Sequence, residues 1–265
     1  MLRVTLLGVG GSGGVPLLGG PEGHGDWGDC DPDEPRNRRS RSSAVVENGA
    51  GRRLLLDAGP DLRGQLLATG LADLEAVVFS HGHADHIMGV DELRIVNRLR
   101  GGSIDAFGTC QTLSELKTRF DYAFRPPAPP TFFRPALTPR AVAPGETVAM
   151  AGMPVRLFRQ DHRVMETLGF RIGQFAYSTD VVTLPEDSLE ALEGLDTWVV
   201  GCLQRNYHPV HANIDRVLEW VDRLRPRRCV LTHMSGDLDW GWMRANLPPG
   251  IEPGHDGMVL DVPDR

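Results

Sequence analysis

The chain has 265 residues, with 28 basic and 35 acidic side chains and a net charge of −7 at pH 7. This length allows one sizeable core, and because no linker-like stretch interrupts the sequence we expect a single domain over residues 1–265. The negative charge disfavours a general binder of nucleic acid or of anionic membranes.

Leu2, Val4 and Leu6 alternate with more polar neighbours and predict a first strand, which starts without a signal peptide. No later stretch is apolar over the length of a membrane span, so we expect a cytoplasmic protein. The strand leads into a glycine-rich segment, residues 8–20, whose start matches GxGxxG. Because no helix opens inside this match and no Gly-Lys-Ser/Thr follows, we interpret it as a mobile loop that approaches a site closely.

Residues 36–41 contain four arginines, the densest basic run of the chain. Such a run is more often a solvated face than a binding site. Guanidinium groups also suit phosphate, however, and we therefore take Arg39 and Arg41 as candidates for binding a substrate phosphate.

Two strands, at 44–47 and 53–57, flank the hairpin signal at 48–49. A short helix is predicted over 62–69 and a second over about 91–100, and glycines end both of them. These elements surround the most informative stretch of the sequence.

That stretch is the apolar run Ala76 to Phe79 followed by Ser80-His81-Gly82-His83-Ala84-Asp85-His86. The run predicts a buried strand, and the polar segment a loop at its end. Imidazole and carboxylate are preferred ligands of zinc, manganese and iron, and here they converge on a small volume. The spacing directs His81 and His83 to one metal centre and leaves Asp85 and His86 for a second. Three histidines within six residues, in a chain with nine, argue against an ordinary polar loop.

A strand is predicted at 104–107, and a capping box at 112–115 opens a helix that runs to residue 120. Residues 126–139 contain six prolines, which predict a stiff loop without a regular element. A lid beside the active site and a plain surface loop are equally compatible with this composition.

Three later strand ends each carry a further candidate ligand. The candidates are His162 after the strand at 155–158, Asp180 after the strand at 175–178 and His233 after the strand at 229–232. Any one of them alone is more often an ordinary loop residue, but together with the first loop they form a set of five histidines and two aspartates at strand ends. Between the last two ends lie a strand at 198–201, a loop at 202–211 and a helix whose apolar stripe is typical of a core-facing helix.

The set of motifs resembles the metallo-β-lactamase superfamily. The matching pieces are Leu55-Leu56-Asp57-Ala58-Gly59, the HxHxDH of His81 to His86, His162, Asp180 and His233, in the order of the family. Finer details resemble the PhnP-like phosphodiesterases, namely Leu7-Gly8 to Gly14-Val15-Pro16, Asp161-His162 before Thr167-Leu168-Gly169-Phe170, Tyr177-Ser178-Thr179-Asp180 and Asp256-Gly257-Met258. The resemblance implies an α/β fold, a four-layer αβ/βα sandwich with two metals in a cleft at the sheet edges.

The resemblance also implies roles for particular residues. His81, His83 and His162 would bind one metal, Asp85, His86 and His233 the other, and Asp180 would bridge them. A histidine near the scissile phosphate matches His211 best, with His208 as the alternative. The implied metals are two divalent ions, manganese or zinc, with iron also compatible.

The four cysteines lie far apart without a CxxC pair, so we expect neither a disulfide framework nor a cysteine-based zinc site. Members of the family can carry a Cys-x-Cys-x-x-Cys insert that holds a structural zinc. This chain has only Cys30 there, with His24 nearby, and it has Gly201 where PhnP proteins tend to have Asp.

We therefore expect a dinuclear phosphodiesterase that hydrolyses a small cyclic phosphate, of the phosphoribosyl 1,2-cyclic phosphate or cyclic nucleotide type. A metal-bridging hydroxide would attack, with Asp85 and the general acid His211 as catalytic residues and Arg39, Arg41 and His208 as substrate contacts. The alternatives are RNA-end processing, thioester hydrolysis, and a non-catalytic binder or carrier in cofactor biosynthesis on the same fold. We expect a small phosphorylated substrate rather than nucleic acid or a membrane as partner, and a homodimer is compatible with the sequence.

Overall fold

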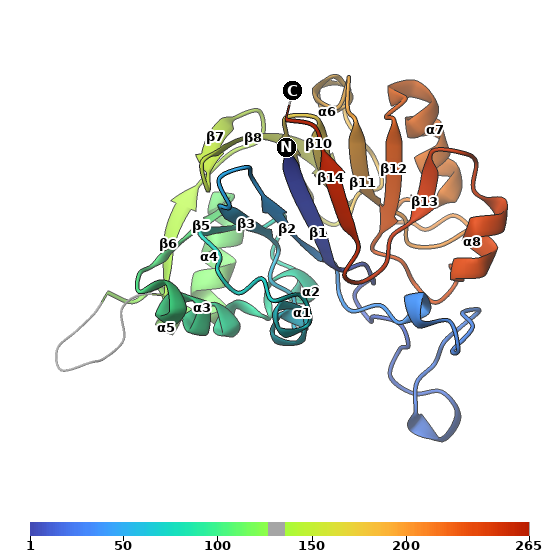
Figure 1. Ribbon diagram of the computed structural model, residues 1–265, viewed down its shortest axis with the longest axis horizontal. Helices are drawn as coiled ribbons and strands as arrows, with labels where there is room; N and C mark the ends of the chain where they lie inside the picture. The colour runs from blue at the N-terminus through green and yellow to red at the C-terminus, as the bar shows by residue number, and fades with distance from the viewer. Residues whose placement is uncertain (127–135, 265) are drawn as a thin grey trace.

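A computed structural model of the protein describes residues 1–126 and 136–264. Two mixed sheets face each other, and helices cover the outer face of each sheet (Figure 1). This arrangement confirms the predicted αβ/βα sandwich. The two termini lie side by side, because β1 and β14 are neighbouring strands.

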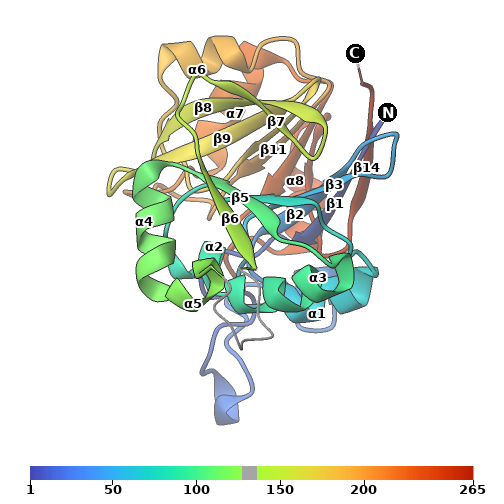
Figure 2. The ribbon, with the colours of Figure 1, turned by 90° about the vertical axis from the view of Figure 1, so that its left-hand side faces the viewer.

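The first sheet has the strand order β14-β1-β2-β3-β4-β5-β6. Its strands are β1 (Leu2–Gly8), β2 (Ser43–Glu47), β3 (Arg53–Leu56), β4 (Ala76–Val78), β5 (Ile104–Gly108), β6 (Leu137–Ala141) and β14 (Val259–Val262). The helices on its outer face are α1 (Leu62–Thr69), α2 (Ala84–Ile87), α3 (Leu93–Arg100), α4 (Cys110–Arg119) and α5 (Asp121–Phe124) (Figure 2).

The second sheet has the order β13-β12-β11-β10-β9-β8-β7. Its strands are β7 (Thr147–Met150), β8 (Met153–Asp161), β9 (Glu166–Ile172), β10 (Phe175–Ser178), β11 (Thr197–Gly201), β12 (Arg228–Thr232) and β13 (Ile251–Pro253). Helices α6 (Glu186–Ala191), α7 (Ile214–Leu224) and α8 (Trp240–Asn246) accompany this sheet, and 3₁₀ turns lie at η1 (Pro21–Gly23), η2 (Pro35–Asn37) and η3 (Val90–Glu92). None of the helices in the described ranges has the length and apolar character needed to span a bilayer.

The inner strands of the first sheet are apolar on both faces because both faces are covered. Leu54 and Leu56 pack in the core between the two sheets, whereas Leu55 packs under the helices on the outside. All three side chains are fully buried. The continuous apolar run in the sequence is thus the signature of a strand that is buried on both faces rather than of an amphipathic one.

The predicted helix at 62–69 is confirmed residue for residue as α1. The predicted capping box at 112–115 is wrong, because α4 already begins at Cys110. Thr109, at the end of β5, provides the cap instead: its hydroxyl accepts the N–H of Thr112 at 3.1 Å.

The proline-rich stretch departs from its prediction in the part that the structure describes. Residues 137–141 form the strand β6, although 126–139 was expected to contain no regular element. Pro139 fits there because β6 is the edge strand of its sheet, where a missing N–H donor is tolerated. The remainder of the predicted loop or lid, residues 127–135, lies outside the described residues.

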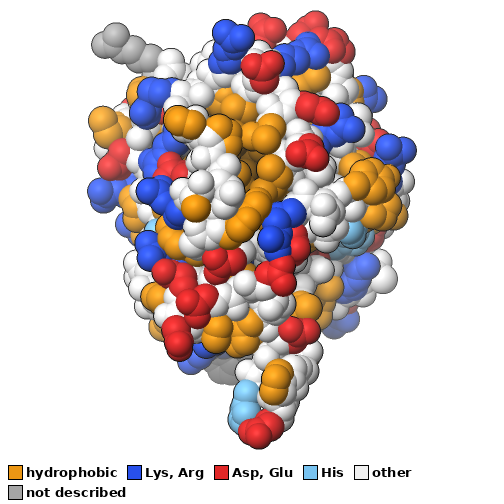
Figure 3. Space-filling model, turned by 90° about the vertical axis from the view of Figure 1, so that its right-hand side faces the viewer, with side chains coloured by type: hydrophobic (Ala, Val, Ile, Leu, Met, Phe, Trp, Pro, Cys, Tyr) orange, Lys and Arg blue, Asp and Glu red, His pale blue; other side chains and the backbone are white. Residues whose placement is uncertain are grey.

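A long segment between β1 and β2 projects from the body of the molecule (Figures 1 and 3). Leu17 and Asp26 pair with each other at its narrow point. At its base the glycine-rich segment is anchored, because Gly10 bridges both to Arg41 and to Met234. The segment therefore borders the end of β12, where one of the candidate ligands lies.

Candidate metal centre

The candidate ligands all follow strand ends that meet at one edge of the sandwich. His81 and His83 lie in the loop after β4, and α2, which begins at Ala84, carries Asp85 and His86. In the facing sheet the strands β8, β10 and β12 run in the same direction. Their ends are followed by the other three candidates, His162, Asp180 and His233. Parallel strands present their carboxyl ends at one edge, which is why residues up to 152 positions apart in the sequence meet here.

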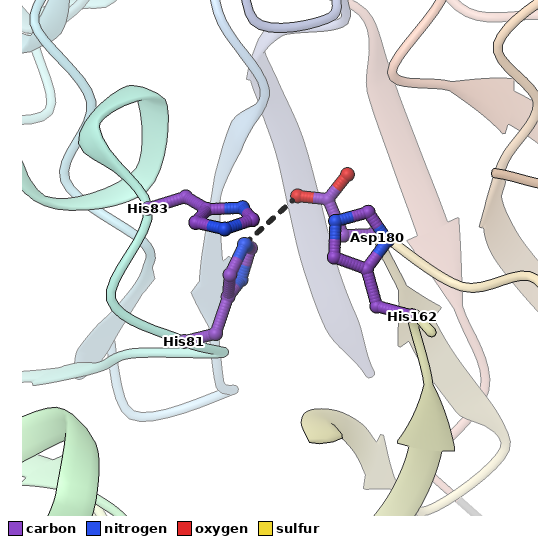
Figure 4. Close-up of side chains that lie close together, drawn as sticks. All are labelled: His81, His83, His162 and Asp180. Atoms are coloured by element: carbon purple, nitrogen blue, oxygen red, sulfur yellow. Dashed lines mark ion pairs between the residues drawn. The ribbon is translucent and has the colours of Figure 1, made fainter. Parts of the chain in front are cut away.

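Two groups of ligand atoms result, and in each group all atoms lie within 4.8 Å of one another. The first group is His81, His83, His162 and Asp180 (Figure 4), and the second is Asp85, His86, Asp180 and His233. Asp180 belongs to both groups. Its Oδ2 lies 3.2 Å from His81 Nε2 and 2.6 Å from His86 Nε2, while its Oδ1 lies 3.1 Å from His233 Nε2.

The donor set fits divalent cations. His81 Nε2, His86 Nε2 and Asp180 Oδ1 are buried and lack a hydrogen-bond partner, although all three point into the crowded centre. Buried polar atoms are rarely left unpaired in native proteins. Imidazole nitrogens and carboxylate oxygens in groups of four are the ligands that zinc, manganese and iron accept.

The electrostatics of the centre agree with a cation site. Burial by itself raises the pKa of Asp180, but the adjacent His233 and His86 outweigh it and hold that pKa well below its ordinary value. The same balance, led by His86, holds the pKa of Asp85 far below its ordinary value. Burial lowers the pKa of His81, whereas the carboxylates around His86 outweigh burial and raise its pKa well above the ordinary value. The carboxylates of Asp85 and Asp180 are therefore held in their ionised form at the centre, and their negative charge favours a bound cation.

Side chains behind the ligands fix which ring nitrogen faces the centre. Asp57 Oδ2 lies 2.8 Å from His86 Nδ1 and also accepts the hydroxyl of Ser80 at 2.8 Å. The same hydroxyl lies 3.0 Å from His81 Nδ1, and the carbonyl of Val210 lies 2.6 Å from His162 Nδ1. Each Nδ1 is thus occupied as a donor, which leaves Nε2 of His81 and His86 as the free ligand atom. Ser80 is not among the predicted ligands, and Asp57 was singled out only through the family resemblance, although the place of Asp57 at a strand end was a usable signal.

His211 lies next to Asp180, and His208 lies next to the ring of His211. His211 Nδ1 is 3.2 Å from Asp180 Oδ1, its side chain is 15% exposed, and its ring centroid is 4.6 Å from that of His162. His208 contacts the His211 ring at 5.2 Å between centroids. Of the two candidates for the general acid, His211 is therefore the one that touches a candidate ligand.

The expected role of Arg39 as a substrate contact is wrong. Arg39 is only 2% exposed, and its guanidinium donates to the carbonyls of Ser235 at 2.9 Å and Leu238 at 2.5 Å. Arg41, by contrast, forms an ion pair with Asp61 at 2.9 Å, and its side chain is partly exposed. A run of arginines looks uniform in sequence, whereas the fold turns one side chain inward and its neighbours outward.

Cys30 is buried, and His24 is exposed near the tip of the projecting segment. Neither belongs to a group of three or more metal-ligating side chains in the part of the chain that the structure describes. Burial leads the causes that raise the pKa of the Cys30 thiol. The described residues around Cys30 therefore give no support for a structural zinc.

Comparison with known proteins places this centre in a family. The beta-lactamase superfamily domain matches residues 52–234, which is more than half of the chain and contains all seven candidate ligands. The chain belongs to the metallo-β-lactamase superfamily. A crystal structure of a diphosphatase from the PhnP family superimposes with a TM-score of 0.88 and 32% identity, and the match covers 98% of this chain and 96% of that one.

Two curated relatives extend the comparison. This chain is 30% identical over its whole length to an octanoyltransferase of Porphyromonas gingivalis, and it spans 52% of the length of that protein. A stretch of 72 residues is 38% identical to ribonuclease Z of Pyrobaculum calidifontis and covers about a quarter of either protein. The PhnP-family diphosphatase thus resembles this chain over nearly its whole length, and ribonuclease Z resembles it over about a quarter.

Proposed function

We propose that the protein is a dinuclear phosphodiesterase that acts on a small cyclic phosphate, of the phosphoribosyl 1,2-cyclic phosphate or cyclic nucleotide type. The observation that carries this proposal is the carboxylate of Asp180, which is shared by two complete groups of ligand atoms and also contacts His211. Two adjacent sites and a nearby proton donor are the components that in-line displacement at a phosphodiester requires.

Two divalent ions bound here would lower the pKa of water and neutralise the negative charge that develops on the phosphate. The metal ligands we propose are His81, His83 and His162 for one ion and Asp85, His86 and His233 for the other, with Asp180 between them.

His211 supplies the proton that a leaving alkoxide needs. Its Nδ1 lies 3.2 Å from Asp180 Oδ1, and the charge of this carboxylate favours the protonated ring that a general acid must carry before it gives up its proton. Asp85 is 11% exposed at the mouth of the second group, where its carboxylate holds the rings of His86 and His233 in place. Arg41, partly exposed beside Asp61, is the arginine that we retain as a phosphate contact.

A second candidate is hydrolysis of a diphosphate, because the PhnP-family neighbour is described as a diphosphatase and covers nearly the whole chain. RNA-end processing finds less support. The ribonuclease Z match spans only a quarter of the chain, the net charge is −7, and on the face shown in Figure 3 acidic and basic side chains are interspersed.

The proposal is tested by metal analysis and by hydrolysis of bis(p-nitrophenyl) phosphate with manganese, with zinc and with chelator. We expect two equivalents of metal per chain and metal-dependent turnover, both of which Asp180→Ala abolishes in a folded protein. Asp161→Ala is a matched control, because Asp161 precedes the ligand His162 but belongs to neither group of ligand atoms. Two bound metals without turnover of diesters, combined with turnover of a diphosphate, would favour the second candidate instead.

A further inference from the structure

The backbone of Asp180 adopts an unusual conformation. Its φ angle is 47°, in the left-handed region that non-glycine residues rarely occupy. Asp180 lies shortly after the end of β10 at Ser178, and its conformation turns the carboxylate toward both groups of ligand atoms. Such a conformation persists only where the surroundings hold it.

Two buried side chains hold the peptide groups on either side of Asp180. Gln160 on β8 and Thr167 on β9 are directly paired across the two strands and are 0% and 1% exposed. Gln160 Nε2 donates to the carbonyl of Thr179 at 2.8 Å and to the hydroxyl of Thr167 at 3.1 Å. The Thr167 hydroxyl donates in turn to the carbonyl of Asp180 at 3.0 Å.

The hydrogen positions in this chain of bonds are determined. The carbonyl of Thr179 can only accept, so the amide nitrogen of Gln160 must face it, and both amide hydrogens are used. Thr167 receives one of them and directs its single hydroxyl hydrogen to Asp180. The oxygen of the Gln160 amide is buried without a hydrogen-bond partner, which lowers the stability of the fold. The two hydrogen bonds that the amide nitrogen donates offset this loss.

Gly169 makes room for this arrangement. A Cβ atom there would lie 2.1 Å from the ring of Phe158 and 2.7 Å from Gln160 Oε1. The Thr167-Leu168-Gly169 segment therefore contributes a hydroxyl at one position and free space for the glutamine two residues later.

We propose that Gln160 and Thr167 are positioning residues for the shared carboxylate of Asp180, and that they thereby set the affinity of both metal sites together. Their hydrogen bonds go to each other and to the two peptide groups that orient Asp180, not to the side chain of a candidate ligand. This inference rests on the dinuclear centre of the proposed function. Because Asp180 serves both groups, a loss of orientation weakens both sites in parallel rather than one alone.

The test is calorimetric titration of the metal-free protein with Zn²⁺ and, separately, with Mn²⁺. Thr167→Val keeps the shape of the side chain and removes its hydroxyl, and we expect both sites to weaken roughly 10- to 100-fold, as for other residues that orient ligands. Thr167→Ser restores the hydroxyl and should bind as the wild type does. Gln160→Leu is the second variant, which should weaken both sites even if Thr167→Val does not fold.

Ser188→Ala is the matched control. Ser188 is 1% exposed and donates to the carbonyl of Arg159 at 2.6 Å, so its loss removes the same kind of buried bond beside Gln160 without touching Thr179 or Asp180. We expect a lower melting temperature and unchanged metal affinity. Wild-type affinity at both sites in folded Thr167→Val and Gln160→Leu, or equal weakening in Ser188→Ala, would overturn this inference alone. A wild-type protein that binds fewer than two ions would overturn the proposed function with it.

Discussion

Replacing Asp57 by asparagine isolates the effect of a ring tautomer on metal binding. Asp57 is fully buried, and its Oδ1 accepts the backbone N–H of Ser80 at 2.7 Å. An asparagine must keep its oxygen there, so its amide nitrogen faces His86 Nδ1, which the carboxylate now contacts at 2.8 Å. The amide donates to Nδ1, and the ring proton of His86 is forced onto Nε2, the atom that lies 2.6 Å from Asp180.

The substitution should weaken the site that contains His86 by roughly 10- to 100-fold, which corresponds to about 1.4 to 2.8 kcal/mol. The site that contains His83 and His162 should change less, because Asp57 reaches it only indirectly, through the Ser80 hydroxyl beside His81. Titration of the metal-free protein with Zn²⁺ resolves the two sites. Asp61→Asn is the control, since Asp61 accepts from Arg41 and touches no candidate ligand. If folded Asp57→Asn bound both ions as tightly as the wild type, control of the tautomer by Asp57 would be refuted.

Three further predictions concern the proton donor, the buried arginine and pH. His211→Ala should lower kcat about 10²- to 10⁴-fold on a cyclic phosphate but little on a p-nitrophenyl diester, whose leaving group needs no proton, and equal losses from His208→Ala would contradict the choice of His211. Arg39→Met removes the donors to the carbonyls of Ser235 and Leu238 and should cost roughly 2 to 5 kcal/mol in denaturant unfolding. Arg38→Met should cost less than about 1 kcal/mol, because the exposed Arg38 guanidinium stacks on Trp27. Burial raises the pKa of Asp256 to about 6, so the folded state binds a proton that the unfolded state releases between pH 4 and pH 6. The contribution of Asp256 to stability should therefore fall by up to about 3 kcal/mol as the pH rises through that window, and a pH profile of unfolding that Asp256→Asn leaves unchanged would contradict this.

Much of the fold could be predicted because its signals are local. Fully apolar runs such as Leu54 to Leu56 indicate strands covered on both faces, and Gly70 after the apolar positions of α1 marks where that helix ends. The incorrect predictions concern segments for which the local sequence is compatible with two structures. Thr109 and Thr112 could each cap α4, and Pro139 argues against a strand unless that strand is known to lie at the edge of a sheet.

The candidate metal centre, too, could be predicted from the sequence only in part. The HxHxDH segment and the places of His162, Asp180 and His233 after apolar strands could be recognised from the sequence, because ligand type and strand periodicity are properties of short segments. The three-dimensional arrangement was needed to see that Arg39 points inward, that His211 rather than His208 contacts Asp180, and that Gln160 and Thr167 bind the backbone around Asp180. These outcomes depend on contacts between residues on different strands and loops, and the direction of a side chain across such a contact is set by packing and burial, which no short segment contains.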